Sequence, residues 1–124
     1  MVGKSIHKYL IKNKIGNVIT ATRKKLNLEN FNKVNKFIKD KKPDAIINCA
    51  GKVGGILANN TFPIEFLNEN IAIQTNLIKS SYLNSVENFI NLGSSCIYPK
   101  NSKQPIKEKY LLSSELEKTN EAYA

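Results

Sequence analysis

The sequence has few of the residues that define several classes of protein. Its 124 residues include two cysteines, one histidine and no tryptophan. Neither Cys49 nor Cys96 has neighbours at metal-ligand spacing, so no metal site is expected. Lysine and asparagine interrupt every apolar run before it reaches the roughly 18 residues that a membrane helix needs. The N-terminal segment MVGKSIHKYLIKNK lacks the apolar centre and cleavage site of a secretory signal, which predicts a cytoplasmic location and reduced thiols.

Arginine is also nearly absent, although the formal net charge is +9. Contacts to bases and phosphates favour the planar guanidinium of arginine, and Arg23 is the only arginine. The lysines are spread along the chain among asparagine and isoleucine, without forming one stripe with interleaved aromatic residues. We therefore expect no nucleic-acid partner, although a basic, non-enzymatic binding module stays open as an alternative.

Helical and extended patterns alternate along the chain. Buried parallel strands are typically continuous apolar runs, and two such runs end at glycines. This order predicts an α/β fold with a doubly wound parallel sheet, helices on both faces and both runs buried on both sides. The expected elements are, in order, a helix at Ser5–Asn13 capped by Ser5, a β-rich segment at Ile15–Thr22, a helix that ends before Pro43, a strand at Asp44–Gly51, a helix at Pro63–Leu83, a strand at Val86–Gly93 and a polar loop at Pro99–Thr119. The helix before Pro43 has Leu28, Phe31, Val34, Phe37 and Ile38 on one face. The apolar positions of the helix at Pro63–Leu83 are Phe66, Leu67, Ile71, Ile73, Leu77 and Ile78.

Two segments follow the expected strands, where ligands bind in open parallel sheets. CAGKVGGILANN has three glycines that allow a ligand to approach the backbone closely, and Asn59 and Asn60 offer amides to it; a flexible loop is the alternative. GSSCIYP holds two hydroxyls and the thiol of Cys96. Taken alone, that thiol is more typical of a small buried apolar residue than of a nucleophile or base.

The segments AGKVGGILANNTFP, LGSSCIYPK, KQPIKE and TNEAYA occur together in this order. With them the chain resembles the GDP-L-fucose synthase family, extended short-chain dehydrogenases/reductases of the NAD-dependent epimerase/dehydratase type. The resemblance implies a Rossmann-type domain, NADP(H) as cofactor, a nucleotide-sugar substrate and a homodimeric parent protein. It implies 3,5-epimerisation and 4-reduction of GDP-4-keto-6-deoxymannose to GDP-L-fucose. Another nucleotide-sugar epimerase or dehydratase of the same superfamily is the alternative.

The resemblance also implies roles for single residues. Ser94 matches the serine that hydrogen-bonds the keto oxygen, Cys96 the base that removes protons beside the keto group, and Tyr123 the proton donor for reduction. Arg23 occupies a place consistent with binding the 2′-phosphate of NADP. The residues implied in cofactor binding are Gly3, Arg23, Ala50, Gly51, Leu92, Gly93, Ser94 and Ser95.

The chain departs from the family pattern at both ends. Of the glycine fingerprint only Gly3 is present, no lysine follows Tyr123, and the only histidine is His7 in the first expected helix. We therefore expect residues 1–124 to form an incomplete NAD(P)-binding Rossmann domain that lacks the first strand and the C-terminal substrate domain. On this interpretation the chain is an internal fragment that is inactive alone.

Overall fold

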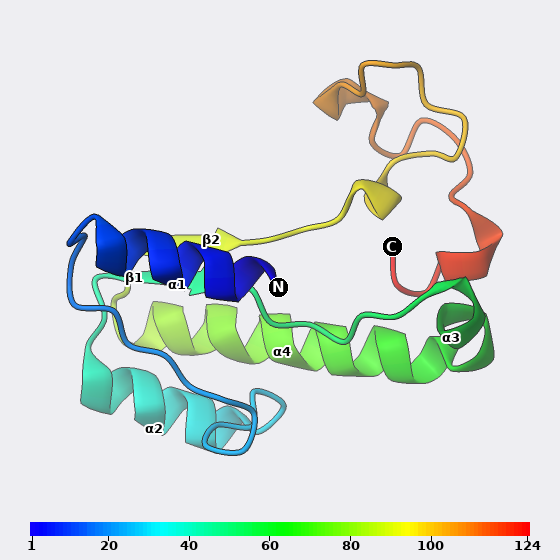
Figure 1. Ribbon diagram of the computed structural model, residues 1–124. Helices are drawn as coiled ribbons and strands as arrows, with labels where there is room; N and C mark the ends of the chain where they lie inside the picture. The colour runs from blue at the N-terminus through cyan, green and yellow to red at the C-terminus, as the bar shows by residue number, and fades with distance from the viewer. The chain divides into compact units, whose positions relative to one another are not determined.

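The computed structural model describes residues 1–124, which form two compact units (Figure 1). The sheet unit comprises residues 1–50 and 72–92, and the loop unit comprises residues 51–71 and 93–124. Helix α4 (Pro63–Leu83), which has the bounds expected from the sequence, contributes its first part to the loop unit and the rest to the sheet unit. None of the helices is long and apolar enough to cross a membrane.

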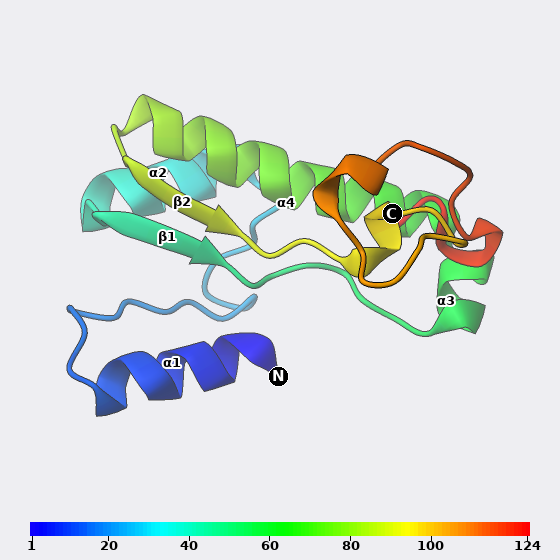
Figure 2. The same ribbon diagram turned by 90° about the horizontal axis from the view of Figure 1, so that it is seen from above.

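The sheet unit is built on two parallel strands, β1 (Ala45–Asn48) and β2 (Asn88–Asn91). Their register pairs Ala45 with Asn88 and Asn48 with Asn91, so the two strands end side by side. Figure 2 shows α1 (Val2–Lys12) on one face of the strands, and α2 (Phe31–Lys41) and α4 on the other. Parallel strands with helices on both faces confirm the expected α/β class.

The core of the sheet unit lies between the strands and helices α2 and α4. Val34 and Ile38 of α2 are buried against Ile73 and Leu77 of α4, together with Leu26. The expected apolar face of the second helix is therefore confirmed at Val34, Phe37 and Ile38, which helical spacing brings to one side, whereas Leu28 lies in a turn before the helix. Side chains that are partly buried against this core are Leu28, Phe37, Ile46, Val86 and Phe89.

The expected burial of both strands on both faces is wrong. Successive side chains of a strand point to opposite faces, so Ile46 and Phe89 meet the core while Ile47 and Ile90 point away from it. Ile47 is 37% exposed and Ile90 is 54% exposed. The physical reason is that helix α1 on that side has no buried residue, and therefore covers the sheet only in part.

The β-rich segment at Ile15–Thr22 is not a strand. A strand forms only where its backbone groups pair with a neighbour, and β1 and β2 pair only with each other in a two-stranded sheet. The isoleucines of this segment, Ile15 and Ile19, are exposed. Apolar composition therefore predicted a strand for which the sheet supplies no partner.

Two further expectations concern helix ends. The Ser5 cap is wrong, because α1 already begins at Val2 with Met1 at its N-cap and no side-chain cap. Helix α2 ends as expected before Pro43: its last residue is Lys41, and Lys42 is the C-cap in the left-handed conformation. Of the six apolar positions expected in α4, Phe66, Ile73 and Leu77 are buried, whereas the exposed ones are Leu67, Ile71 and Ile78.

The loop unit contains α3 (Ile56–Thr61), the first part of α4 and three short 3-10 helices. These are η1 (Ser95–Ile97), η2 (Glu108–Tyr110) and η3 (Lys118–Asn120). Helix α3 packs against η3. Apart from η2 and the first residues of η3, residues 99–119 are turns and irregular backbone, as the polar composition predicted.

Candidate functional site

In the sheet unit, the ends of the two strands are joined by Asn48. This side chain is only 5% exposed, and its amide donates a 2.7 Å hydrogen bond to Oδ1 of Asn91. Its own Oδ1 accepts from the backbone N–H of Ala50 at 3.0 Å, and its carbonyl accepts from Leu92 at 3.1 Å. Asn48 thus fixes two of the predicted cofactor residues, Ala50 and Leu92. Asn48 was not predicted from the sequence, although its place at the end of the apolar run AIIN was a signal.

The first turn of α1 lies beside the end of β1. A Cβ at Gly3 would lie 3.2 Å from the Cβ of Cys49, a contact that a side chain would make only if its neighbour shifted. No side chain caps α1 at its N-cap, Met1, so no capping side chain accepts from the N–H groups of the first turn. Gly3 therefore stands where a glycine allows a helix N-terminus to approach the end of a strand.

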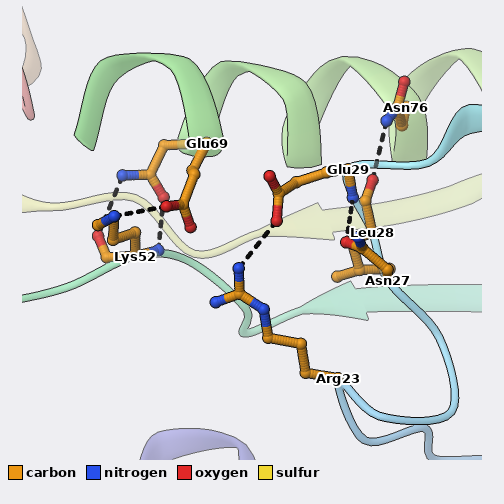
Figure 3. A network of polar contacts seen from close by, with 8 residues as sticks. Arg23, Asn27, Leu28, Glu29, Lys52, Glu69 and Asn76 are labelled. Atoms are coloured by element: carbon orange, nitrogen blue, oxygen red, sulfur yellow. Dashed lines mark hydrogen bonds and ion pairs between the residues drawn. The ribbon is translucent and has the colours of Figure 1, made fainter. Parts of the chain in front are cut away.

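Arg23, the residue expected at a 2′-phosphate, lies in a turn before α2. Its guanidinium forms a 2.9 Å ion pair with Glu29 and its side chain is 74% exposed (Figure 3). An exposed pair of this kind contributes little to stability.

In the loop unit, Asn70 of α4 fixes the segment that begins at Gly51. Its Oδ1 accepts from the backbone N–H of Lys52 at 2.8 Å, and its Nδ2 donates to the carbonyl of Lys52 at 3.0 Å. The ammonium group of Lys52 is paired with Glu69 (Figure 3) and lies 5.6 Å from the ring centroid of Phe66. The backbone and the ammonium group of Lys52 are therefore both bound to side chains of α4.

The glycine pair of KVGG is held from within the loop unit. Asn59 is buried, and its amide donates to the carbonyls of Gly54 and Gly55 at 3.0 and 3.1 Å. A Cβ at Gly54 would lie 2.8 Å from Cζ of Phe66. The Nδ2 group of Asn59 is therefore used within the loop unit, whereas its Oδ1 is buried without a hydrogen-bond partner, and whether it meets a ligand stays a prediction. The close approach at Gly54 is made by the Phe66 ring.

Ser94 and Cys96 lie together at η1. Ser94 is the N-cap of this short helix, and its Oγ accepts a 3.2 Å hydrogen bond from the backbone N–H of Cys96. The sulfur of Cys96 accepts a 3.3 Å hydrogen bond from Nδ2 of Asn120. The thiol is therefore partly buried and held by a polar contact, which differs from a cysteine that only fills an apolar core.

Tyr123 follows Asn120 by three residues, and its backbone N–H donates to the carbonyl of Asn120 at 3.0 Å. The Tyr123 ring meets Phe66 edge to face, with ring centroids 6.3 Å apart and an interplanar angle of 83°. Asn120 thus connects the segment of Cys96 to that of Tyr123. Its role was missed in the sequence, where nothing marks an asparagine as the partner of a cysteine 24 residues away.

A cavity of about 290 Å³ adjoins Cys96 in the loop unit. Two polar atoms of its lining residues, Oγ of Ser102 and Oδ1 of Asn120, are buried without a hydrogen-bond partner. Lys100 and Glu117, which also line it, form a 2.7 Å ion pair. The hydrogen bond from Lys100, followed by that from the Thr119 backbone, holds the pKa of Glu117 below its usual value.

The predicted site residues divide between the two units. The sheet unit holds Gly3, Arg23, Ala50 and Leu92, and the loop unit holds the rest: Gly51, Gly93, Ser94, Ser95, Cys96 and Tyr123. All three predicted catalytic residues thus belong to one compact unit. No group of three or more His, Cys, Asp or Glu side chains is placed to hold a metal ion.

Comparison with known proteins gives a family match over the whole chain. The family model described as the NAD-dependent epimerase/dehydratase family matches residues 1–124. The chain is 48% identical over 124 residues to a GDP-L-fucose synthase of Sinorhizobium fredii, covering 100% of this chain and 39% of the relative. It is 45% identical over 124 residues to GDP-L-fucose synthase 1 of Arabidopsis thaliana, again covering 100% of this chain and 38% of the relative. The chain therefore spans about two fifths of the length of these relatives.

A solved structure confirms the fold. A GDP-mannoheptose C4 reductase of Campylobacter jejuni, solved with NADP bound, is 36% identical to this chain and superposes with a TM-score of 0.92. The match covers 98% of this chain and 38% of that protein.

Proposed function

Since the chain belongs to the NAD-dependent epimerase/dehydratase family, we propose that it forms part of an NADPH-dependent nucleotide-sugar epimerase/reductase of the GDP-L-fucose synthase type. The reaction is the 3,5-epimerisation and 4-reduction of a GDP-4-keto-6-deoxymannose. The observation that carries the proposal is the connected set of Ser94, Cys96 and Tyr123 in one compact unit, linked through Asn120.

The cofactor residues of the sheet unit fit a dinucleotide. The first turn of α1 has no capping side chain, and Gly3 has no Cβ to obstruct an approach beside Cys49. A phosphate anion is stabilised at such a helix N-terminus by the N–H groups and the helix dipole. Arg23 would hold a 2′-phosphate, and Ala50 and Leu92 would contact the cofactor from the strand ends.

The residues of the loop unit would do the proton chemistry. Ser94 donates a hydrogen bond to the keto oxygen of the sugar, which makes the neighbouring C–H bonds more acidic. The thiolate of Cys96 takes a proton from the adjacent carbon, and the electron pair of the broken C–H bond passes into an enolate. A second acid, in exchange with solvent, then donates a proton to the opposite face of the same carbon, which consumes the enolate and inverts the centre. When bound, NADPH supplies the hydride to C4, and Tyr123 donates the proton that the resulting alkoxide needs.

A homodimer is the proposed assembly. Helix α4 carries exposed apolar side chains at helical spacing, and such a stripe on a helix is typical of a protein contact. Sedimentation of the chain with and without Ile71→Lys tests this, and a monomer at high concentration in both would contradict it. The exposed side chains of the stripe, all in the loop unit, are Ile64, Leu67 and Ile71.

A chimeric enzyme tests the proposed reaction. Residues 1–124 would replace the matching segment of the Sinorhizobium fredii GDP-L-fucose synthase, to which they are 48% identical. The chimera should oxidise NADPH with the 4-keto sugar and exchange solvent deuterium into C3 and C5. We expect Cys96→Ser to abolish the exchange and Tyr123→Phe to abolish NADPH oxidation. Tyr9→Phe, in the exposed face of α1, is the matched control and should change neither.

A chimera that folds and binds NADPH, but neither oxidises it nor exchanges deuterium, would contradict the proposal. The likeness to a GDP-mannoheptose C4 reductase favours one second candidate, a GDP-4-keto-sugar reductase without epimerisation. The same chimera separates the two, because a pure reductase would oxidise NADPH without incorporating deuterium at C3 and C5.

A further inference from the structure

The sulfur of Cys96 receives its hydrogen bond from a neutral side chain. Nδ2 of Asn120 lies 3.3 Å from Sγ, within the range for a hydrogen bond to sulfur. A donor that points at a sulfur restricts the position of that sulfur, because the hydrogen bond weakens when the two atoms separate. We propose that Asn120 is a positioning residue for Cys96, which holds the sulfur in place for its part in proton transfer. The proposal rests on the role of Cys96 as a base.

Asn120 is itself fixed by the short helix η3. Its backbone N–H donates to the carbonyl of Glu117 at 3.1 Å, and its carbonyl accepts from the N–H groups of Tyr123 and Ala124, both at 3.0 Å. The side chain of Glu117 caps the same helix by accepting from Thr119. These bonds fix the backbone of Asn120, so that its side chain begins from one position when it donates to the sulfur.

Charged groups lie near Cys96, but the hydrogen bond to its sulfur comes from the amide of Asn120. Lys100 lines the same cavity, and its ammonium group is paired with Glu117 at 2.7 Å. Tyr98, on the segment of Cys96, and Tyr123, on the segment of Asn120, are the neighbouring groups that can titrate, while Lys118 and Glu121 flank Asn120 in the sequence. Helix α3, which packs on η3, has no charged residue.

Asn120 also connects the proposed base of the epimerisation, Cys96, to the proposed proton donor of the reduction, Tyr123. Asn120 donates to the sulfur of the base through its side chain and accepts from Tyr123 through its backbone. A shift of η3 would therefore displace the proton donor and the base together. The unpaired Oδ1 of Asn120 is the remaining acceptor of this amide, buried among the residues that line the cavity.

The test uses the reactivity of the thiol, which needs neither cofactor nor turnover. Cys49→Ser leaves Cys96 as the only thiol of the chain. In this background, alkylation by iodoacetamide is measured from pH 6 to 10 for Asn120, Asn120→Asp and Asn120→Ala. Asp keeps the size of the side chain but replaces the donor by an acceptor. The alkylation rates of the three proteins are also measured in urea, where the chain is unfolded and the rates should be equal. Dividing by these rates corrects for the intrinsic reactivity of the thiol.

We expect both variants to slow alkylation at pH 7 by roughly 2- to 10-fold, the range that the loss of one hydrogen bond gives. An unchanged profile in variants with a native circular-dichroism spectrum would overturn the proposal. So would faster alkylation at every pH, which would show that Asn120 only shields the thiol.

A second measurement observes the native Asn120 and can therefore be made even if the Asn120 variants fail to fold. In the Cys49→Ser chain, the side-chain amide protons of Asn120 are followed by NMR while Cys96 ionises. They should move with the same midpoint as the Cβ resonance of Cys96, and Cys96→Ser should abolish the movement. Resonances that stay constant would overturn the proposal. Because neither readout uses turnover, failure of the proposed reaction is seen separately in the chimeric enzyme.

Discussion

The side-chain amide of Asn48 donates a 2.7 Å hydrogen bond to the side-chain oxygen of Asn91, across the last register pair of the two strands. Asn48 also satisfies the backbone N–H groups of Ala50 and Leu92. One buried polar residue therefore fixes the point where each strand turns into a proposed binding segment. A hydrogen bond at a buried site is costly to leave unmade, which makes this relationship testable.

Asn48→Ala should lower the free energy of unfolding by about 1–3 kcal/mol, because it leaves Asn91 and the N–H of Ala50 without their partner. Urea unfolding followed by circular dichroism measures the change. Asn88→Ala is the matched control, since Asn88 lies at the start of β2, is exposed and makes only a 3.4 Å contact to the carbonyl of Asp44. Equal stabilities of the two variants would contradict the role of Asn48.

Gly54→Ala should destabilise the loop unit by about 1–3 kcal/mol, because its Cβ would lie 2.8 Å from the buried ring of Phe66. Phe66 packs on Tyr123, so the tyrosine side-chain resonances should shift as well. Gly93→Ala is the matched control, since its Cβ would meet nothing within 4 Å. The control should be neutral or slightly stabilising. If both variants unfold at the same urea concentration, the close approach of Phe66 is not what requires a glycine at position 54.

The local parts of this fold were predictable from the sequence, and the long-range parts were not. Helix α4 has its expected bounds and α2 its expected apolar face, because helical spacing is set by neighbouring residues. The strand expected at Ile15–Thr22 failed because strand formation depends on a pairing partner elsewhere in the chain. Composition could not reveal that the other strands keep one face partly exposed.

The same division applies to the candidate site. Motif order led to Ser94, Cys96 and Tyr123, which the fold gathers in one unit. The asparagines that hold the segments, Asn48 and Asn120, were missed because an amide has the same appearance in a sequence whether it faces water or a buried partner. Their partners at Asn91 and Cys96 are remote in the sequence, so only the folded chain identifies them.

Asn70→Ala should free the Lys52 segment from α4, since it removes the acceptor for the Lys52 N–H and the donor to its carbonyl. We expect amide exchange at Lys52 to accelerate at least tenfold, while the strands of the sheet unit keep their protection. Asn68→Ala on the exposed side of the same helix is the control and should leave the exchange unchanged. Exchange at Lys52 that is equally slow in both variants would show that Asn70 does not hold the segment.

Glu117 should make the loop unit sensitive to acid. Its pKa is lowered, chiefly by the hydrogen bond from Lys100 and then by that from the Thr119 backbone, so folding favours its charged form. The stabilisation is therefore complete above the unfolded value of about 4.3 and is lost as the pH falls through the lower, folded value. An NMR titration of the Glu117 carboxyl should have its midpoint below the usual glutamate range. In Lys100→Ala the midpoint should rise, and in Glu117→Gln the acid-induced change at Thr119 should disappear. A midpoint that is the same with and without Lys100 would show that the ion pair does not hold η3, because the removed ammonium group is the largest cause of the shift.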